Sequence, residues 1–483
     1  MYVFTRTAPT GHRRRGARTI AASGLVAASA IVLAGCGGSG GGTEVDPGAA
    51  NGWSQEFAGT ELNVLAEATL NSEILAELAP EFTAMTGIEV NIETAPFAQL
   101  VQSVTLDFST GAGDFDVVSI PYDYLGAYAG SGYREEITPL IDANADKVGD
   151  GFNQEDILPG LWATAAQWDG KYYGMPSNSA VTMMIYREDL ISDAGEQAAF
   201  KAAYGYDLAP ATTWEQYYDI AEFFTRDAGE TLAGEVLEQP IYGVTIAGKR
   251  HEAAVFEWIN YANSFGGGVV SPEGELVVDS AGSVESLEYM SSLGEFSPPG
   301  YTSATWDEVT AQLQQGIAVQ AISWGDTAGA MENPEQSAVV GKMGYGDVPV
   351  LAVGDDPHAL HGAWTYTISA QAENVDAAYL FTAWALSESV QKSIGELGGV
   401  PATWSAFEDP ELVASLPSWP QQLSSLENAL ARPRNAEWPQ MLEQLALQVS
   451  NALVEESTAS DALTDAQNEI TSILGDKLPL KAF

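Results

Sequence analysis

Residues 61–66, Glu61-Leu-Asn-Val-Leu-Ala66, alternate polar and apolar side chains and predict the first strand of a folded body. Asn71 or Ser72 is expected to cap the helix that follows, Pro80 to bend it, and Gly87 to end it. The helix is indicated by apolar residues that recur at a period near 3.6, namely Ile74, Leu75, Leu78, Phe82 and Met85.

Two more strands continue this pattern. Apolar residues alternate over 88–92, a helical segment is expected over 99–108, and Asp116-Val-Val-Ser-Ile120 has the composition of a buried strand. Strand, helix, strand, helix, strand is typical of a mostly parallel α/β sheet. In such a sheet the groups that contact a ligand lie at the carboxyl ends of the strands.

The later part of the chain keeps the same mixture. Thr213-Trp-Glu-Gln216 and Thr305-Trp-Asp-Glu308 each match a capping box at the start of a helix. Helices are also expected over 253–265 and over 438–453. No short repeat is present, and roughly 430 residues exceed what a single core usually supports, so we expect two lobes.

The amino terminus has the order of a bacterial export signal. A head rich in arginine and free of acids precedes an apolar run, residues 20–33, that is too short to cross a bilayer comfortably. Leu33-Ala-Gly-Cys36 resembles a lipobox, and Cys36 is the only cysteine of the chain. We therefore expect a signal peptide over 1–35, lipidation of Cys36, and a flexible tether over 36–58. The expected location is the outer face of the cell membrane, held by the lipid anchor.

The chain is strongly acidic, with 66 Asp and Glu against 19 Lys and Arg. Loss of residues 1–35 would remove five arginines and no acid, which moves the formal net charge from -47 to -52. Such a charge repels nucleic acid and anionic lipid, so we expect neither as a partner. The acids are scattered, which favours a solvated surface, while a specific cationic ligand stays open as the alternative.

Several segments resemble the extracellular solute-binding proteins of ABC importers, in the sugar-binding group that includes the maltose-type receptors. The segments occur in the order typical of that family, and they are Phe82-Thr-Ala-Met-Thr-Gly-Ile-Glu-Val90, Gly113-Asp-Phe-Asp-Val-Val-Ser-Ile120, Gly170-Lys-Tyr-Tyr-Gly-Met-Pro176, Met184-Ile-Tyr-Arg-Glu-Asp-Leu190, Pro210-Ala-Thr-Thr-Trp-Glu215, Gln315-Gly-Ile-Ala-Val-Gln-Ala-Ile-Ser-Trp-Gly325 and Gly398-Gly-Val-Pro-Ala402.

The resemblance implies a periplasmic-binding-protein-like α/β fold, with two lobes joined by hinge strands and a ligand cleft between them. The implied amino-terminal lobe comprises 59–175 and 350–408, and the carboxy-terminal lobe 176–349 and 409–483. The chain is expected to cross between lobes near 174–176, near 348–350 and around Asp409. A closed, carbohydrate-loaded monomer would then dock on a membrane permease, without a cofactor.

A carbohydrate has hydroxyl edges and an apolar C–H face, so its receptor needs aromatic rings and planar polar groups. Trp324 is the strongest candidate, because the family often places an aromatic residue there. The full set of predicted ligand-binding residues is Glu67, Tyr122, Asp123, Asn178, Arg250, His251, Trp258, Trp324, Asp326, Trp364 and Arg432, with Arg434 as the alternative to Arg432.

Other interpretations stay open at this point. Each tryptophan can be a core residue, and each charged residue a surface or salt-bridge residue. The same fold can bind a glycerol phosphodiester or a peptide-like solute, and acids with aromatics also suit a glycoside hydrolase. Asp355-Asp-Pro-His-Ala-Leu-His361 collects acids and histidines without an established zinc spacing, so we expect no metal site.

Overall fold

The computed structural model describes residues 51–480, so the predicted signal segment, Cys36 and most of the tether lie outside the described residues. Trp53 is already packed, because it is buried and its ring meets the ring of Phe82 edge-on at 6.2 Å. The tether that was predicted to reach residue 58 therefore ends earlier. A large apolar side chain such as Trp53 gains too much from burial to remain in a solvated linker.

The first sheet has five strands in the order β2-β1-β3-β13-β6. Its first three strands are parallel, whereas β13 runs antiparallel to β3 and to β6. The parallel part confirms the sheet predicted from the alternation of strands and helices. The five strands are β1 (Glu61–Glu67), β2 (Glu89–Ala95), β3 (Val117–Pro121), β6 (Met175–Pro176) and β13 (Trp364–Ile368).

Helix α1 (Leu70–Thr86) joins β1 to β2. Thr69 is the residue before its first turn and has the extended backbone of an N-cap, so the prediction of Asn71 or Ser72 was wrong by two or three residues. Pro80 lies inside the helix. Gly87 ends it with a φ of 74°, a conformation that glycine adopts without strain, as predicted.

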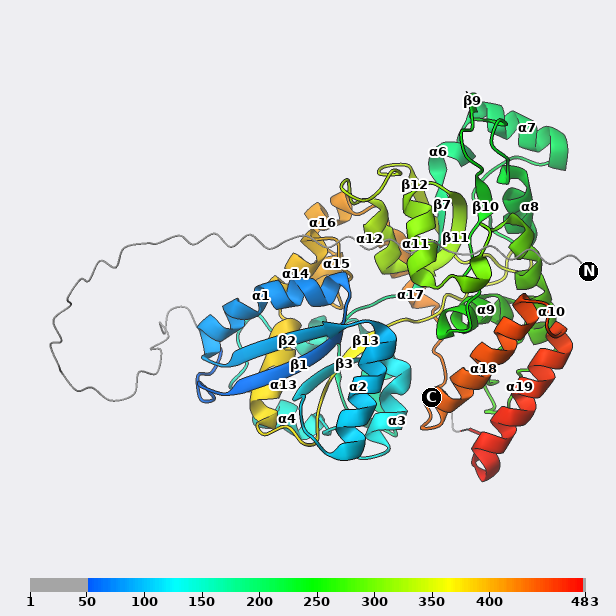
Figure 1. Cartoon of the computed structure of the whole chain (residues 1–483). Helices are drawn as coiled ribbons and strands as arrows, with labels where there is room; N and C mark the ends of the chain where they lie inside the picture. The colour runs from blue at the N-terminus through cyan, green and yellow to red at the C-terminus, as the bar shows by residue number, and fades with distance from the viewer. Residues whose placement is uncertain (1–50, 481–483) are drawn as a thin grey trace, which may run out of the picture. The chain divides into compact units, whose positions relative to one another are not determined.

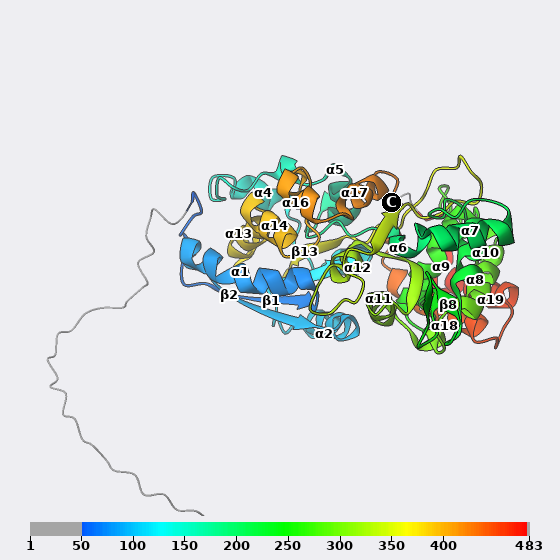
Figure 2. The same ribbon diagram turned by 90° about the horizontal axis from the view of Figure 1, so that it is seen from above.

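Alternation along the strands sends side chains to two different layers. Leu62 and Val64 pack with Phe381 of α13 (Val375–Ala385) on one face, while Leu65 packs with Phe108 of α2 (Phe97–Thr110) on the other. The turned view shows the same arrangement, with α13 and α2 on opposite sides of the sheet (Figure 2).

The second sheet has four strands in the order β10-β11-β7-β12, of which β10 and β11 are parallel and the others antiparallel. One face carries Met183 and Ile185 against α11 and α12, and the other carries Val244 and Val319 against helices that include α9. These strands are β7 (Thr182–Arg187), β10 (Tyr242–Val244), β11 (Ala318–Trp324) and β12 (Met343–Gly346).

Both predicted capping boxes are confirmed, at Thr213 before α8 and at Thr305 before α11. Around the second sheet, α18 lies beside α9 and α19 (Figure 1). The helices near this sheet are α6 (Glu188–Ile191), α7 (Ala194–Tyr204), α8 (Trp214–Phe224), α9 (Glu252–Ser264), α10 (Ala281–Ser292), α11 (Trp306–Gln314), α12 (Gly325–Met331), α18 (Trp438–Leu453) and α19 (Ala459–Leu474).

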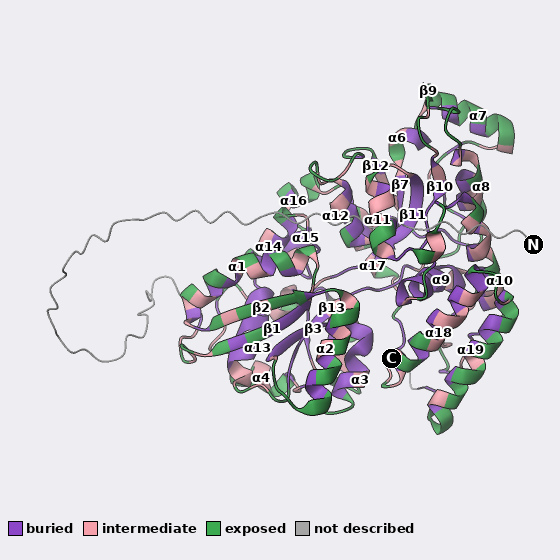
Figure 3. Ribbon diagram, viewed as in Figure 1, coloured by how far each residue is buried: buried purple, intermediate pink, exposed green. Residues whose placement is uncertain are grey.

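Buried strands such as β3 and β7 contrast with outer helix faces that are exposed (Figure 3). Shorter elements complete the described chain. They are α3 (Leu125–Ala129), α4 (Thr138–Ala143), α5 (Pro159–Leu161), α14 (Glu388–Glu396), α15 (Trp404–Phe407), α16 (Pro410–Ser415), α17 (Trp419–Glu427), β4 (Gln167–Trp168), β5 (Lys171–Tyr172), β8 (Thr231–Leu232), β9 (Glu235–Val236) and the single turns η1 (Tyr122–Tyr124), η2 (Gln154–Asp156), η3 (Trp162–Ala166), η4 (Leu293–Phe296), η5 (Tyr301–Ser303) and η6 (Gly475–Lys477).

The chain passes between the two sheets at places that the pairing of its backbone identifies. It leaves the first sheet after Pro176 and joins the second at Thr182, and in between Val181 pairs with His361 on the return path to β13. At the second expected crossing, near 348–350, Val350 pairs with Thr213, which precedes α8 on the side of the second sheet. The third crossing is expected around Asp409. Phe407, before it in the sequence, and Trp419, after it, both belong to the apolar cluster that contains Trp384.

None of the helices between residues 51 and 480 combines the length and apolarity needed to span a bilayer.

Candidate functional site

Four segments bring side chains to the edge of one cleft. Glu67 ends β1, and Trp364 opens β13 opposite Pro121 at the end of β3, so the antiparallel strand reaches the same edge as the parallel ones. Trp324 ends β11 of the second sheet. Together with residues of α9, α11 and α12 they line a cleft of about 940 Å³, a volume that suits a small solute.

Aromatic rings form much of the cleft wall. Trp324 is half-buried and its ring meets Phe256 edge-on at 6.3 Å. Gly362 lies against the same ring, since a Cβ at this position would collide with the indole. The position of Trp324 therefore depends on a neighbour that has no side chain.

A second aromatic group stands opposite. The ring of Phe97, at the start of α2, meets Trp364 edge-on at 5.9 Å and Trp306 edge-on at 6.2 Å. Trp306 is the first residue of α11, which packs against the second sheet. The contact between Phe97 and Trp306 therefore connects the two sides of the cleft. Exposed ring faces in a cleft are the surfaces on which the C–H face of a carbohydrate stacks.

Arg432 is the only basic side chain among the described residues that line the cleft. It is 3% exposed, and its Nε donates to Asp123 Oδ2 at 2.8 Å. Its guanidinium lies 4.1 Å from the ring centre of Phe256 and 5.8 Å from that of Trp324. Its Nη1 is buried and has no hydrogen-bond partner, although buried donors are usually paired, and the residue lines the cleft.

Carboxyl groups from both sides face the same space. Burial, and then repulsion from Asp326 and Asp307, raises the pKa of Glu67 to about 8. Burial also raises the pKa of Glu252 well above its usual value. Asp326 is open to the cleft but surrounded by protein on its other sides, and this desolvation raises its pKa as well.

Asn178 lies in the connection between the sheets. Its Oδ1 accepts the backbone N–H of Trp364 at 3.0 Å and that of Ala180 at 3.4 Å. Asn178 therefore ties the connection to the start of β13 and also lines the cleft.

Six predicted residues line this cleft, and the others lie elsewhere. Those at the cleft are Glu67, Asn178, Trp324, Asp326, Trp364 and Arg432. Tyr122 and Asp123 are fully buried behind Arg432, where the Tyr122 hydroxyl accepts the backbone N–H of Arg432 at 2.6 Å. They hold the arginine and do not line the cleft.

The remaining predicted residues have structural positions. Trp258 is fully buried and donates to Ser286 Oγ at 2.9 Å, which places it between α9 and α10. Arg434 donates to the backbone carbonyls of Ala163, Thr164 and Gln167. All three bonds of Arg434 come from its Nη1, while its Nε is buried without a hydrogen-bond partner. Both side chains are therefore held by contacts within the protein and do not line the cleft.

Arg250 and His251 precede α9. Arg250 is exposed and does not line the cleft. His251 accepts the N–H of Ala253 as the N-cap, and its ring meets that of Trp306 at 5.0 Å. Burial, and then the charge of Lys249, lowers the pKa of His251. His251 thus supports a wall residue of the cleft.

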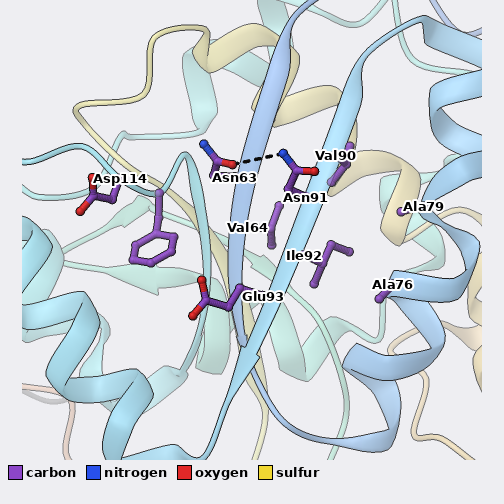
Figure 4. A pocket seen from close by; sticks show the side chains of 10 residues that line it. Asn63, Val64, Ala76, Ala79, Val90, Asn91, Ile92, Glu93 and Asp114 are labelled. Atoms are coloured by element: carbon purple, nitrogen blue, oxygen red, sulfur yellow. Dashed lines mark hydrogen bonds between the residues drawn. The ribbon is translucent and has the colours of Figure 1, made fainter. Parts of the chain in front are cut away.

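Two other places are set apart from this cleft. No group of three or more His, Cys, Asp and Glu within the described residues is arranged to hold a metal ion, and this includes the segment 355–361. A hollow of about 670 Å³ lies along the amino-terminal halves of β1 and β2, where Asn63 and Asn91 are hydrogen-bonded at 3.4 Å (Figure 4). It is at the opposite end of the parallel strands from Glu67.

A sequence profile of bacterial extracellular solute-binding proteins matches residues 77–421, which is most of the chain. The chain is a bacterial extracellular solute-binding protein. This result confirms the family resemblance, and the solved structure described next confirms the periplasmic-binding-protein-like fold with its two α/β lobes and cleft.

Relatives with known names cover nearly the whole described region of this solute-binding protein. A probable amino-acid ABC transporter periplasmic-binding protein of Sinorhizobium fredii is 26% identical over 86% of this chain and 90% of its own length. An erythritol/L-threitol-binding protein of Mycolicibacterium smegmatis is 25% identical over 83% of this chain and 84% of its own. A solute-binding protein of Agrobacterium radiobacter, solved with ribitol, is 26% identical with a TM-score of 0.76, covering 86% of this chain and 99% of that one.

Sequence reasoning missed several cleft residues of this solute-binding protein. Phe97 lies two residues after the end of β2, so the rule that selected Glu67 and Tyr122 at strand ends would have found it. Trp306 and Asp307 lie within the capping box of α11, a feature that marks a helix start and gives no sign of a ligand. Glu252 and Phe256 belong to a helix whose cleft-facing side could not be known without the fold.

Proposed function

We propose that this protein is a receptor of an ABC transporter that captures a carbohydrate, either a sugar, an oligosaccharide or a sugar alcohol. The solute would bind in the 940 Å³ cleft, the two lobes would close on it by a hinge motion, and the closed form would deliver it to a membrane permease. The lobe boundaries follow the division 59–175 with 350–408 and 176–349 with 409–483.

The observation that carries this proposal is the composition of the cleft wall. Trp324, Trp364 and Trp306 offer apolar faces, and they stand beside carboxylates and the unpartnered Nη1 of Arg432. Rings for the C–H face and planar polar groups for the hydroxyls are what a carbohydrate requires. The names of the relatives, which include polyols and an amino acid, agree with a small polar solute and do not decide between these classes.

We further propose that the protein makes and breaks no bond of its ligand. The family consists of solute-binding proteins, which supports a binding role over hydrolysis. Incubation with disaccharides followed by chromatography tests this point, because any release of monosaccharide contradicts it.

The proposed location is the outer face of the cell membrane. It rests on the lipobox-like Leu33-Ala-Gly-Cys36 and on membership of an extracellular family. A protein with Cys36→Ser should be released into the medium, whereas wild type should remain with membranes and partition into detergent. We also propose that the receptor acts as a monomer, which size-exclusion chromatography with light scattering tests.

A thermal-shift screen over sugars and sugar alcohols tests the ligand class. A ligand that binds only the folded state at 100 times its Kd stabilises the protein by about 2.7 kcal/mol, which is a clear rise in Tm. A rise with at least one carbohydrate supports the proposal. No rise with any carbohydrate, together with a rise for amino acids or phosphodiesters, contradicts it.

A further inference from the structure

The lining of the cleft has many more acidic than basic side chains. Its described lining has one basic side chain, Arg432, and the acids Glu67, Glu73, Glu252, Asp307, Asp326, Glu332 and Glu396. Arg432 is already paired with Asp123, so its charge is balanced from behind the cleft wall. Burial raises the pKa values of Glu67 and Glu252, so the negative charge that remains in the cleft at pH 7 comes mainly from the other acids of the lining.

Helix ends reduce this charge without cancelling it. Glu73, Glu252, Asp307 and Asp326 lie in the first turns of α1, α9, α11 and α12. Each helix amino terminus contributes roughly half a positive charge, so the four together contribute roughly two. The acids of the lining outnumber this contribution, so the helix dipoles alone do not explain why so many acids are present.

Three carboxyl groups of the cleft lining lack a cationic partner and come from both sides of the cleft. Glu67 belongs to the first sheet, whereas Asp307 and Asp326 belong to helices of the second. None of the three forms a salt bridge with a described residue, and the Asp326 carboxylate accepts from backbone N–H groups, including that of Thr327. Asp307 and Asp326 both act electrostatically on Glu67, which shows that the charges share one region.

The same cleft has surfaces that stabilise cations. Phe256 and Trp324 already hold the guanidinium of Arg432 over their rings, and Phe97, Trp306 and Trp364 form a second aromatic group beside the acids. Aromatic faces attract ammonium groups, and the attraction is stronger where water is excluded. Arg432 lines the same cleft and has a buried N–H group without a partner, so its guanidinium is the donor that a hydroxyl oxygen of the same molecule can use.

We propose that the cleft selects a hydroxylated solute that carries a positively charged amine, such as an amino sugar or an aminated sugar alcohol. This inference rests on the proposed function and narrows its ligand class. The ammonium lies between Glu67, Asp307 and Asp326, and a hydroxyl oxygen accepts from Arg432. An ammonium beside Glu67 favours the ionised form of this carboxyl and adds charge attraction to the hydrogen bonds. A neutral polyol forms the hydrogen bonds alone.

The test compares ligands that differ only by the amine. Calorimetric titration of the purified protein with sorbitol against 1-amino-1-deoxysorbitol, and with glucose against glucosamine and N-acetylglucosamine, is carried out at pH 7 with EDTA present. The amine is expected to tighten binding at least about tenfold in one pair, and acetylation is expected to remove the gain. The gain should shrink at 0.5 M NaCl, because salt screens the attraction.

Variants assign the gain to the three acids. Glu67→Gln and Asp326→Asn should each reduce the preference for the amine at least about threefold, while Glu77→Gln, an exposed acid on α1 outside the cleft lining, should leave it unchanged. Equal or tighter binding of the neutral partner in every pair overturns this inference and leaves the proposed function standing. Absence of binding for every carbohydrate, charged and neutral, overturns both.

Discussion

Substitution by alanine is expected to have different effects at Trp324 and at Trp258. Trp324 is half-buried in the cleft wall, whereas Trp258 is fully buried with its indole N–H hydrogen-bonded to Ser286. Trp324→Ala is expected to weaken carbohydrate binding at least about tenfold in calorimetry, because the ring provides a stacking surface. Trp258→Ala is expected to lower the free energy of unfolding by about 3–5 kcal/mol in urea denaturation.

The two variants control for one another. Where Trp258→Ala remains folded, its affinity should equal that of wild type, since its side chain does not line the cleft. An unchanged affinity in Trp324→Ala would show that the ligand binds elsewhere.

Glu67 should make stability depend on pH. Its folded-state pKa of about 8 lies above the ordinary value of 4.5, because of burial and the nearby Asp326 and Asp307. Between these values the folded protein keeps a proton that the unfolded chain has released. The contribution of Glu67 is therefore fully present below pH 4.5 and falls as pH rises toward 8, by at most ~1.4 kcal/mol per pH unit.

Glu67→Gln should remove the pH-dependent contribution of Glu67 to the stability of the unliganded protein. Denaturation curves measured from pH 5 to pH 8 should show the variant gaining on wild type as pH rises. Glu252, whose pKa Glu67 helps to raise, stays in both proteins. Glu77→Gln serves as the control and should give a curve parallel to wild type. A constant difference between Glu67→Gln and wild type across this range would contradict the prediction.

At the scale of elements, one buried ion pair joins parts far apart in the sequence. Asp123 of η1 accepts from Arg432 at 2.8 Å and from the indole N–H of Trp438, at the start of α18, at 2.9 Å. Arg432→Met leaves Asp123 buried without its cation and is expected to destabilise the protein by about 3–5 kcal/mol. Asp123→Asn with Arg432→Met should lose less than the sum of the single variants, as urea denaturation of all four proteins can measure.

Additive losses would mean that the pair has no energetic coupling. The ion pair between Lys392 and Asp409 provides a comparison with the buried pair, because the Lys392 side chain is 41% exposed. The variant Lys392→Met breaks this pair. Its loss should be below about 1 kcal/mol.

The same pair illustrates what the sequence can and cannot predict. Strands β1 to β3, the end of α1 at Gly87 and the capping boxes of α8 and α11 follow from local patterns, and these predictions are confirmed. Arg432 was predicted as a cleft residue, but its pairing with Asp123 spans 309 positions and has no local signal. The strand-end rule also predicted Tyr122 and Asp123 as contacts, yet the structure places both behind Arg432, because the turn η1 folds back into the core.

At the scale of the whole described body, apolar packing is continuous between the two sheets. One cluster contains Leu65 and Val118 of the first sheet together with Trp258 and Trp438 near the second. Across the cleft, Phe97 meets Trp306 and His251 at 6.2 and 6.4 Å. These contacts join α2 to α11 and α9, so they stabilise the arrangement in which the two sides of the cleft are close together.

Closure on a ligand should therefore depend on Phe97. Saturating ligand is expected to reduce the radius of gyration of wild type in X-ray scattering, as a hinge motion requires. Phe97→Ala removes the two edge contacts that cross the cleft, to Trp306 and His251, of about 0.5–1.5 kcal/mol each. The closed fraction should therefore fall and the apparent Kd should rise about tenfold. Phe223→Ala is the control, because its edge contact, with Phe200 at 5.1 Å, lies on one side of the cleft only. This variant should leave the closed fraction and the apparent Kd unchanged. A radius of gyration that ligand does not alter in wild type would show that capture proceeds without closure.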